Sequence, residues 1–137
     1  MPDNNKPTVL IVDDSTDIRS MLRLWLERNE CRVVEAADGK QAVVLAGQEQ
    51  PDLILMDLYL PELDGAVAVA RIREHAGLER VPIVAISAYG ASGIGAQLSS
   101  DPQAAGFNEY LTKPFAPEKL EELLNRYLRK SKGAPDV

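Results

Sequence analysis

Five short runs rich in Val, Ile and Leu, separated by longer segments with helical spacing, constrain the fold of this chain most strongly. The runs occupy residues 8–12, 31–36, 53–56, 83–86 and 109–112. Strands that alternate with helices predict parallel pairing, because each crossover helix returns the chain to the same edge of the sheet. Three of the runs are continuously apolar, which is typical of strands buried on both faces. The pattern predicts an α/β fold: a doubly wound (βα)5 sandwich around a five-stranded parallel sheet.

The segments between the runs predict helices. The first helix has Ser15 or Asp14 as its N-cap and an apolar stripe spaced i, i+3, i+4, i+7 and i+8. This stripe consists of Ile18, Met21, Leu22, Trp25 and Leu26. The third helix, at about residues 65–75, carries Val67, Ala70 and Ile72. The last helix begins at Pro117, because proline suits the first turn of a helix.

The domain organisation follows from length and from local composition. A chain of 137 residues fits one domain with a single core. We expect an N-terminal tail at residues 1–7, one domain at 8–130 and a disordered polar tail at 131–137. Residues 88–106 are rich in glycine and contain Pro102. Glycine costs about 1 kcal/mol against alanine inside a helix, so we expect a long loop and a short or irregular fourth helix there.

Charge and composition exclude several classes of function. The net charge of −6, from 15 basic and 21 acidic residues, argues against direct binding to nucleic acid, which needs a basic surface. No window approaches the roughly 18 apolar residues of a membrane span, and the N-terminus lacks a signal-peptide core. We therefore expect a cytoplasmic protein that does not bind membranes. The single cysteine, Cys31, cannot form an internal disulfide and is expected to be a small buried apolar residue.

Acidic residues follow two of the apolar runs. Asp13 and Asp14 follow the first run, and Asp57 follows the third. If the strand order is 2-1-3-4-5, these carboxylates meet at the edge of the sheet where doubly wound folds bind ligands. Three crowded carboxylates repel one another, and a divalent cation relieves that repulsion. Hard oxygen ligands suit Mg²⁺, which takes one or two carboxylates and a phosphate oxygen.

A cation site of this kind suits phosphoryl transfer. Asp57 is a candidate nucleophile, because a carboxylate can form an aspartyl phosphate. The charge on a transferring phosphoryl group needs cations placed in advance. Lys113, just past the fifth run, can supply one, and Ser87, at the end of the fourth run, can donate its hydroxyl to a phosphoryl oxygen.

At these positions the chain resembles the receiver domains of two-component response regulators, over about residues 7–130. The motifs that carry the resemblance are Val12-Asp13-Asp14, Met56-Asp57-Leu58-Tyr59-Leu60-Pro61-Glu62-Leu63-Asp64-Gly65, Ile86-Ser87-Ala88 and Tyr110-Leu111-Thr112-Lys113-Pro114-Phe115. Each motif alone is weak, but four in order are specific. The resemblance implies a flavodoxin-like or CheY-like three-layer sandwich.

The resemblance also implies a role for each matching residue. Asp57 would accept a phosphoryl group from a phosphohistidine on a sensor histidine kinase or a histidine phosphotransfer protein. Asp13, Asp14, Asp57 and the backbone carbonyl of Tyr59 would hold Mg²⁺, with Mn²⁺ as an alternative ion. Ser87 and Lys113 would bind the phosphoryl group, and Tyr110 would turn inward as the hydroxyl moves. The changed surface of helix 4, strand 5 and helix 5 would then be read by a downstream protein.

Two features depart from the family pattern or tune it. Tyr59 and Tyr89 occupy the positions that tune dephosphorylation in the family, and both are bulky enough to shield a phosphoryl group from water. No Lys or Arg lies between Arg80 and Lys113. The dimer that transcription-factor receivers form through basic residues of helix 4 is therefore not expected, and we predict a monomer or a weak phosphorylation-linked dimer.

We interpret the chain as a phosphoacceptor switch that phosphorylates and dephosphorylates itself, rather than as a turnover enzyme. One alternative is a receiver-like interaction module that works without phosphorylation. Another is a receiver fragment of a larger regulator. A Mg²⁺-dependent phosphohydrolase would usually carry a second Asp two residues after its nucleophile, where this chain has Tyr59. A nucleotide-binding or flavin-binding sandwich is weaker still, because no Gly-rich loop follows the first strand.

Overall fold

The computed structural model describes residues 6–58, 65–87, 106–113 and 116–129. Its five strands form one parallel sheet in the order β2-β1-β3-β4-β5. They are β1 (Thr8–Val12), β2 (Arg32–Ala36), β3 (Leu53–Asp57), β4 (Ile83–Ser87) and β5 (Glu109–Thr112). The predicted fold class and strand order are confirmed. The predicted fourth helix falls within 88–105, outside the described residues, as do residues 1–5 of the predicted N-terminal tail and the whole predicted C-terminal tail, 131–137.

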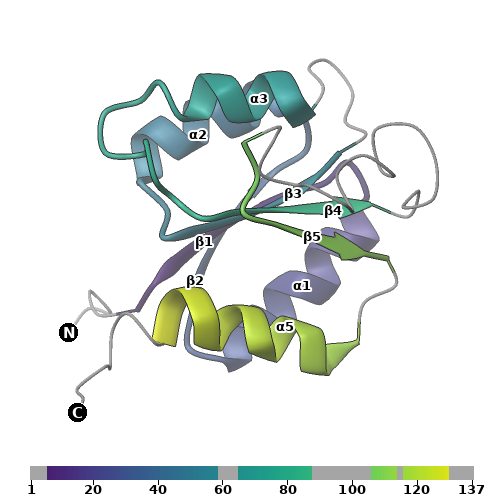
Figure 1. Ribbon diagram of the computed structural model, residues 1–137. Coiled ribbons are helices and arrows are strands. Elements are labelled where there is room, and N and C mark those ends of the chain that lie inside the picture. The colour runs from purple at the N-terminus through teal and green to yellow at the C-terminus, as the bar shows by residue number, and fades with distance from the viewer. Residues whose placement is uncertain (1–5, 59–64, 88–105, 114–115, 130–137) are drawn as a thin grey trace, which may run out of the picture.

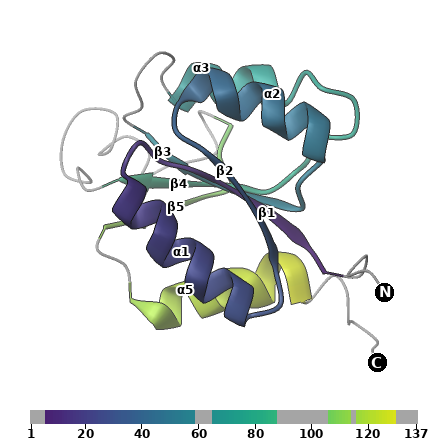
Figure 2. The same cartoon turned by 180° about the vertical axis from the view of Figure 1, so that it is seen from behind.

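Helices cover both faces of the sheet. α2 (Gly39–Glu49) and α3 (Gly65–Ile72) lie on one face, and α1 (Thr16–Arg28) and α5 (Pro117–Leu124) lie on the other, as Figure 1 and Figure 2 show from opposite sides. A π-helical segment, Asn125–Arg129, continues α5. Ser15 is the N-cap of α1, because its Oγ accepts from the Ile18 N–H at 3.2 Å. Pro117 stands in the first turn of α5, as predicted.

The continuous apolar strands are explained by two cores, one on each face of the sheet. Successive side chains of a strand point to opposite faces. In β1, Val9 and Ile11 therefore pack with Leu22 and Leu26 of α1, in a core that also receives three leucines of α5. Leu10 and Val12 pack on the other face, with side chains of α2 and α3. Each fully buried Leu or Ile stabilises the fold by about 1.5–3 kcal/mol.

The face that α3 buries differs from the expected one. Val67 is 39% exposed and Ala70 is also exposed, whereas Ile72 is fully buried as expected. The buried face is formed by Gly65, Ala68, Val69 and Ile72, with the spacing i, i+3, i+4, i+7. Nearly every position of this helix is apolar, so periodicity alone could not choose between two overlapping stripes.

Other expectations about single residues can be compared with the structure. Cys31 is 3% exposed and belongs to the core under α1, as predicted. Ile18 and Trp25 are partly buried against the same core. The predicted stripe is wrong at Met21, which is 50% exposed because it lies at the edge of the buried face. In the described part of the chain, no helix combines the length and apolar character needed to cross a membrane.

Candidate functional site

The site begins with the register of two neighbouring strands. β1 and β3 pair in parallel with Val12 opposite Met56. One residue further along, Asp13 and Asp57 therefore stand side by side at the carboxyl ends of these strands. The hydrogen bond from the Asp13 N–H to the Ala36 carbonyl, at 3.1 Å, ties the same point to the end of β2. The sheet itself brings the two carboxylates together.

Three carboxylates form a cluster at this edge. Each of Asp13, Asp14 and Asp57 offers an oxygen, and these oxygens lie within 4.8 Å of one another. Asp13 is 2% exposed and Asp57 is 7% exposed, whereas Asp14 is exposed to solvent. Three carboxylate oxygens at this separation, two of them on buried residues, are a hard donor set that suits Mg²⁺. These donors fit the ion that the sequence predicts.

Lys113 joins the cluster from the end of β5. Its Nζ lies 2.9 Å from Asp13 Oδ2 and 3.3 Å from Asp57 Oδ2. Burial lowers the pKa of Lys113, but the carboxylates of Asp13 and Asp57 outweigh burial and raise this pKa above its ordinary value. The ammonium group is therefore charged at neutral pH. It bridges the two buried acids and offsets part of their negative charge.

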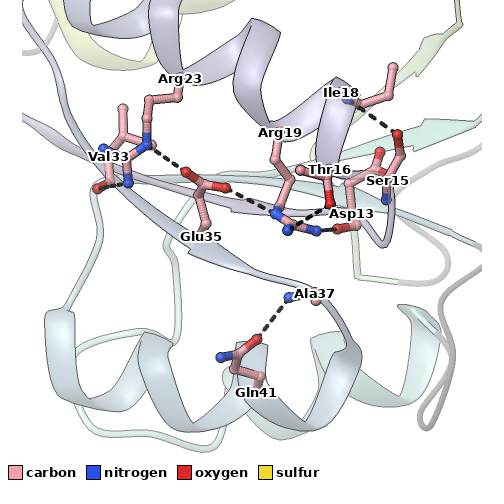
Figure 3. Close-up of polar contacts among 10 residues, drawn as sticks. All are labelled: Asp13, Ser15, Thr16, Ile18, Arg19, Arg23, Val33, Glu35, Ala37 and Gln41. Carbon is pink, nitrogen blue, oxygen red and sulfur yellow. Dashed lines mark hydrogen bonds and ion pairs between the residues drawn. The ribbon is translucent and has the colours of Figure 1, made fainter.

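Asp13 is held through both its side chain and its backbone. Oδ1 accepts from the Ser15 N–H at 2.9 Å, while Oδ2 accepts from Lys113. The backbone carbonyl accepts from Arg19 Nη1 at 2.7 Å. Figure 3 shows the Arg19 guanidinium lying between this carbonyl and Glu35. The sequence indicated the acids but gave no sign of this arginine, whose distance from Asp13 along the chain matches no functional motif.

The backbone after Asp57 is packed against the start of α3. The Leu58 N–H donates to the Ile86 carbonyl at 3.0 Å, which extends the pairing of β3 with β4. A Cβ added to Gly65 would lie 3.3 Å from the carbonyl oxygens of Asp57 and Leu58. Gly65 therefore allows α3 to approach the candidate phosphoacceptor closely. Its place in the motif around Asp57 was the available sequence signal.

The remaining predicted site residues are described in part or not at all. Ser87 is the last residue of β4 and pairs with Thr112, but its side chain lies outside the described part of the structure. Tyr59 and Tyr89 also lie outside the described residues. Tyr110 packs against the core under α2 and α3, and its buried hydroxyl has no hydrogen-bond partner among the described residues. The ring is therefore turned inward, while its switching role stays a prediction.

Comparison with known proteins identifies the class. The response regulator receiver domain family matches residues 9–125 of this chain. The chain therefore belongs to the family of response regulator receiver domains.

Relatives of known sequence agree with this assignment. An "uncharacterized 14.6 kDa protein in sodA1 3′region" of Leptolyngbya boryana is 38% identical over 122 residues, which cover 87% of this chain and 88% of that protein. The transcriptional regulatory protein SrrA of Staphylococcus aureus is 33% identical over 125 residues, covering 91% of this chain. The chain spans about half the length of that regulator, 49%.

Solved structures show the same fold. The receiver domain of the sensor histidine kinase PA1611 from Pseudomonas aeruginosa has a TM-score of 0.79 and 36% identity, with 89% of this chain and 97% of that one covered. That structure has a magnesium ion coordinated in its active-site cleft. The chemotaxis response regulator CheY4 of Vibrio cholerae has a TM-score of 0.78 and 32% identity, covering 90% and 99% of the two chains.

Proposed function

We propose that this chain is a phosphoacceptor switch of a two-component phosphorelay. Asp57 accepts a phosphoryl group from a phosphohistidine on a sensor histidine kinase or a histidine phosphotransfer protein. Asp13, Asp14 and Asp57, with the Tyr59 carbonyl, hold Mg²⁺. The protein then signals to a partner by a change of shape, and turns over no other substrate. A cytoplasmic location is part of this proposal.

The transfer step uses the buried carboxylate as nucleophile. An oxygen of Asp57 forms the new bond to phosphorus as the phosphorus–nitrogen bond of the donor breaks, and the bonding pair leaves with the imidazole nitrogen. Lys113 stabilises the negative charge on the transferring group from its place beside Asp57, and Ser87 binds a phosphoryl oxygen. Mg²⁺, when bound, would neutralise part of the same charge.

One observation carries the proposal: the Lys113 ammonium touches both Asp57 and Asp13 within a cluster of three carboxylates. A helix cap or a solvated loop acid has no need of such a cluster. Breaking a buried ion pair costs several kcal/mol, and burying two acids beside each other, with a third close by, is unfavourable unless cations offset them. The arrangement suits an acid that must stay ionised and accessible to a phosphoryl donor.

The signalling surface in this proposal includes β5 and α5. A groove of about 500 Å³ lies between these elements. Lys119, Glu122 and Arg126 line it together with the residues of β5. Because Lys113 immediately follows β5, movement of Lys113 towards a phosphoryl group shifts the end of this groove. The predicted partner surface would change there first.

Intact mass measured after incubation with acetyl phosphate tests the proposal. We expect the wild-type chain to gain the mass of one phosphoryl group in Mg²⁺ and none in EDTA. Asp57→Asn should gain nothing under either condition. Asp17→Asn is the matched control, because Asp17 is an exposed acid in the first turn of α1. This variant should be labelled like the wild type.

Two results would contradict the proposal. The first is a folded wild-type protein that gains no mass from acetyl phosphate and none from a phosphorylated histidine phosphotransfer protein. The second is a mass gain that persists in Asp57→Asn, which would locate the modification at another residue.

A further inference from the structure

We infer that Arg19 is a positioning residue for the predicted Mg²⁺ site: it fixes the peptide plane that joins Asp13 to Asp14. This inference rests on the proposed function and goes beyond it, because Arg19 touches neither the phosphoryl group nor the metal in the proposed arrangement. It acts through the backbone of the two acids.

The contacts of Arg19 reach in two directions. Nη1 donates to the Asp13 carbonyl at 2.7 Å, and Nε donates to Glu35 Oε1 at 2.9 Å. The Arg19 side chain is 16% exposed, so these contacts are largely shielded from solvent. A guanidinium is a rigid planar fork, and fixing two of its nitrogens fixes the whole group. Figure 3 shows this fork held between β2 and the turn that starts α1.

The carbonyl that Arg19 binds belongs to the peptide between Asp13 and Asp14. A peptide unit is planar, so a hydrogen bond to its oxygen also restrains the orientation of the Asp14 N–H and Cα. Asp13 is restrained independently by Ser15 and Lys113. Asp14 is exposed, and nothing comparable is seen for its carboxylate among the described contacts. The hydrogen bond from Arg19 to the Asp13 carbonyl is therefore the contact that restrains the backbone of Asp14 relative to Asp13.

Glu35 explains how a cation can stay beside a predicted metal site. Its Oε1 pairs with Arg19 and its Oε2 pairs with Arg23 Nε at 2.5 Å. Pairing with Glu35 offsets the positive charge of Arg19, which would otherwise repel a divalent ion. The β2 edge of the sheet thus supplies an acid that orients Arg19 and reduces its electrostatic cost.

Arg23 provides a matched comparison within the same network. It stands one turn later on α1 and binds the same Glu35, but its other contacts are Glu27 Oε2 at 2.8 Å and the Val33 carbonyl at 3.4 Å. Within the described part of the chain, the contacts of Arg23 do not reach the turn at Asp13. Removing either arginine breaks one ion pair between α1 and β2, and only removal of Arg19 frees the Asp13–Asp14 peptide.

The test compares Mg²⁺ affinity with stability in the full chain. Titration calorimetry gives the Mg²⁺ dissociation constant, and urea unfolding in EDTA gives the stability of the metal-free protein. We expect Arg19→Ala to raise the dissociation constant about tenfold, the scale seen for groups that orient metal ligands. Arg23→Ala should change the Mg²⁺ dissociation constant less than twofold. It should lower the urea midpoint about as much as Arg19→Ala does. Arg19→Lys should fall between, because one ammonium cannot span both partners.

A second readout needs no metal. The Asp14 amide is part of the peptide that Arg19 holds, so its ¹⁵N and ¹H chemical shifts in EDTA should move in Arg19→Ala and Arg19→Lys. The same chemical shifts should be unchanged in Arg23→Ala. If Arg19 had a purely structural role, both alanine variants would lower the urea midpoint. The Asp14 amide chemical shifts would then change to the same extent in both variants, or in neither.

The outcomes separate this inference from the proposed function. Wild-type Mg²⁺ affinity in both Arg19 variants, or equal weakening in Arg23→Ala, would overturn the inference and leave the proposed function intact. A wild-type protein that binds no Mg²⁺ would overturn the proposed metal site, and the inference with it. If Arg19→Ala fails to fold, the affinity and the Asp14 shifts of Arg19→Lys decide.

Discussion

Lys113→Met should destabilise the metal-free protein and make its stability more dependent on Mg²⁺. Methionine keeps most of the length and packing of the lysine stem but removes the ammonium that bridges Asp13 and Asp57 at 2.9 and 3.3 Å. Each hydrogen bond between charged groups contributes about 1.5–3 kcal/mol. The Lys113 side chain is 19% exposed, so part of that contribution is lost to solvent. We expect the free energy of unfolding in EDTA to fall by about 2–4 kcal/mol.

Mg²⁺ should recover more of this stability in the variant than it adds to the wild type. In the wild type the ion competes with the Lys113 ammonium for Asp13 Oδ2 and meets one neighbouring positive charge. In the variant both obstacles are gone and the three acids face one another without the lysine. Binding adds RT ln(1 + [Mg²⁺]/Kd), about 2.7 kcal/mol at a concentration of 100 Kd, so a tighter Kd gives a larger increment at the same concentration.

Urea unfolding with and without Mg²⁺, at fixed ionic strength, measures both effects. Lys119→Met is the control, because Lys119 is an exposed lysine of α5 that lies outside the carboxylate cluster. That variant should unfold like the wild type and respond equally to Mg²⁺. A Lys113→Met protein with unchanged stability in EDTA, or with a smaller Mg²⁺ increment than the wild type, would refute the reasoning.

Two further changes test the packing behind the acids and the support of α1. Gly65→Ala places a Cβ 3.3 Å from the backbone of Asp57 and Leu58, so we expect a loss of about 1–2 kcal/mol in urea unfolding and slower labelling by acetyl phosphate. Gly47→Ala, which crowds the His75 ring instead, should leave the labelling rate unchanged. Hydrogen bonds from Arg23 and Arg19, acting against burial, lower the pKa of Glu35 below its usual value. Glu35 therefore stabilises the fold above the ordinary glutamate pKa of 4.5, and this contribution is lost as pH falls through the lower folded pKa. The difference in unfolding free energy between wild type and Glu35→Gln should shrink below about pH 4.5, and a constant difference from pH 6 to 3 would contradict the assignment.

The fold was predictable because its strands carry a local signal. In β1, four consecutive apolar residues, Val9 to Val12, are needed because two side chains enter each core. The same residue types in a half-exposed strand would alternate with polar ones. Helix α1 was predictable from its apolar spacing, but only in part: Leu22 and Leu26 are buried, whereas Met21 of the predicted stripe is 50% exposed. Helix α3 was not, because its apolar residues leave the buried face undetermined until the sheet is in place.

The acids of the site were predictable for a related reason. Asp57 ends β3, Asp13 directly follows β1 and Lys113 directly follows β5, and parallel strands bring their carboxyl ends to one edge. Any residue whose place depends only on strand order could be located in this way. The signal was therefore topological, and it needed no knowledge of side-chain conformations.

Residues whose contacts depend on how separate elements pack together could not be located from the sequence. His75 is partly buried, with Nε2 2.9 Å from the Val43 carbonyl oxygen, and no sequence pattern marks this position. The room for its ring comes from Gly47, where a Cβ would lie 2.7 Å from His75 Cε1. That fit depends on how α2 and the end of α3 dock, which no local pattern in either segment encodes. Arg19 was missed for the same reason, because its two partners, the Asp13 carbonyl after β1 and Glu35 in β2, are brought together only by the fold.

Asp13 is the point at which these contacts meet, and this has a consequence for the proposed switch. Its backbone is bound to β2 and to Arg19 of α1, and its carboxylate is bound to Lys113 after β5. Lys113 is shared between Asp13 and Asp57, so added negative charge on Asp57 would draw the ammonium away from Asp13. The bond to Asp13 would weaken while Arg19 still holds the Asp13 backbone in place. The fixed partner is then α1 and the moving partner is the end of β5, which directs the proposed change of shape towards β5 and α5.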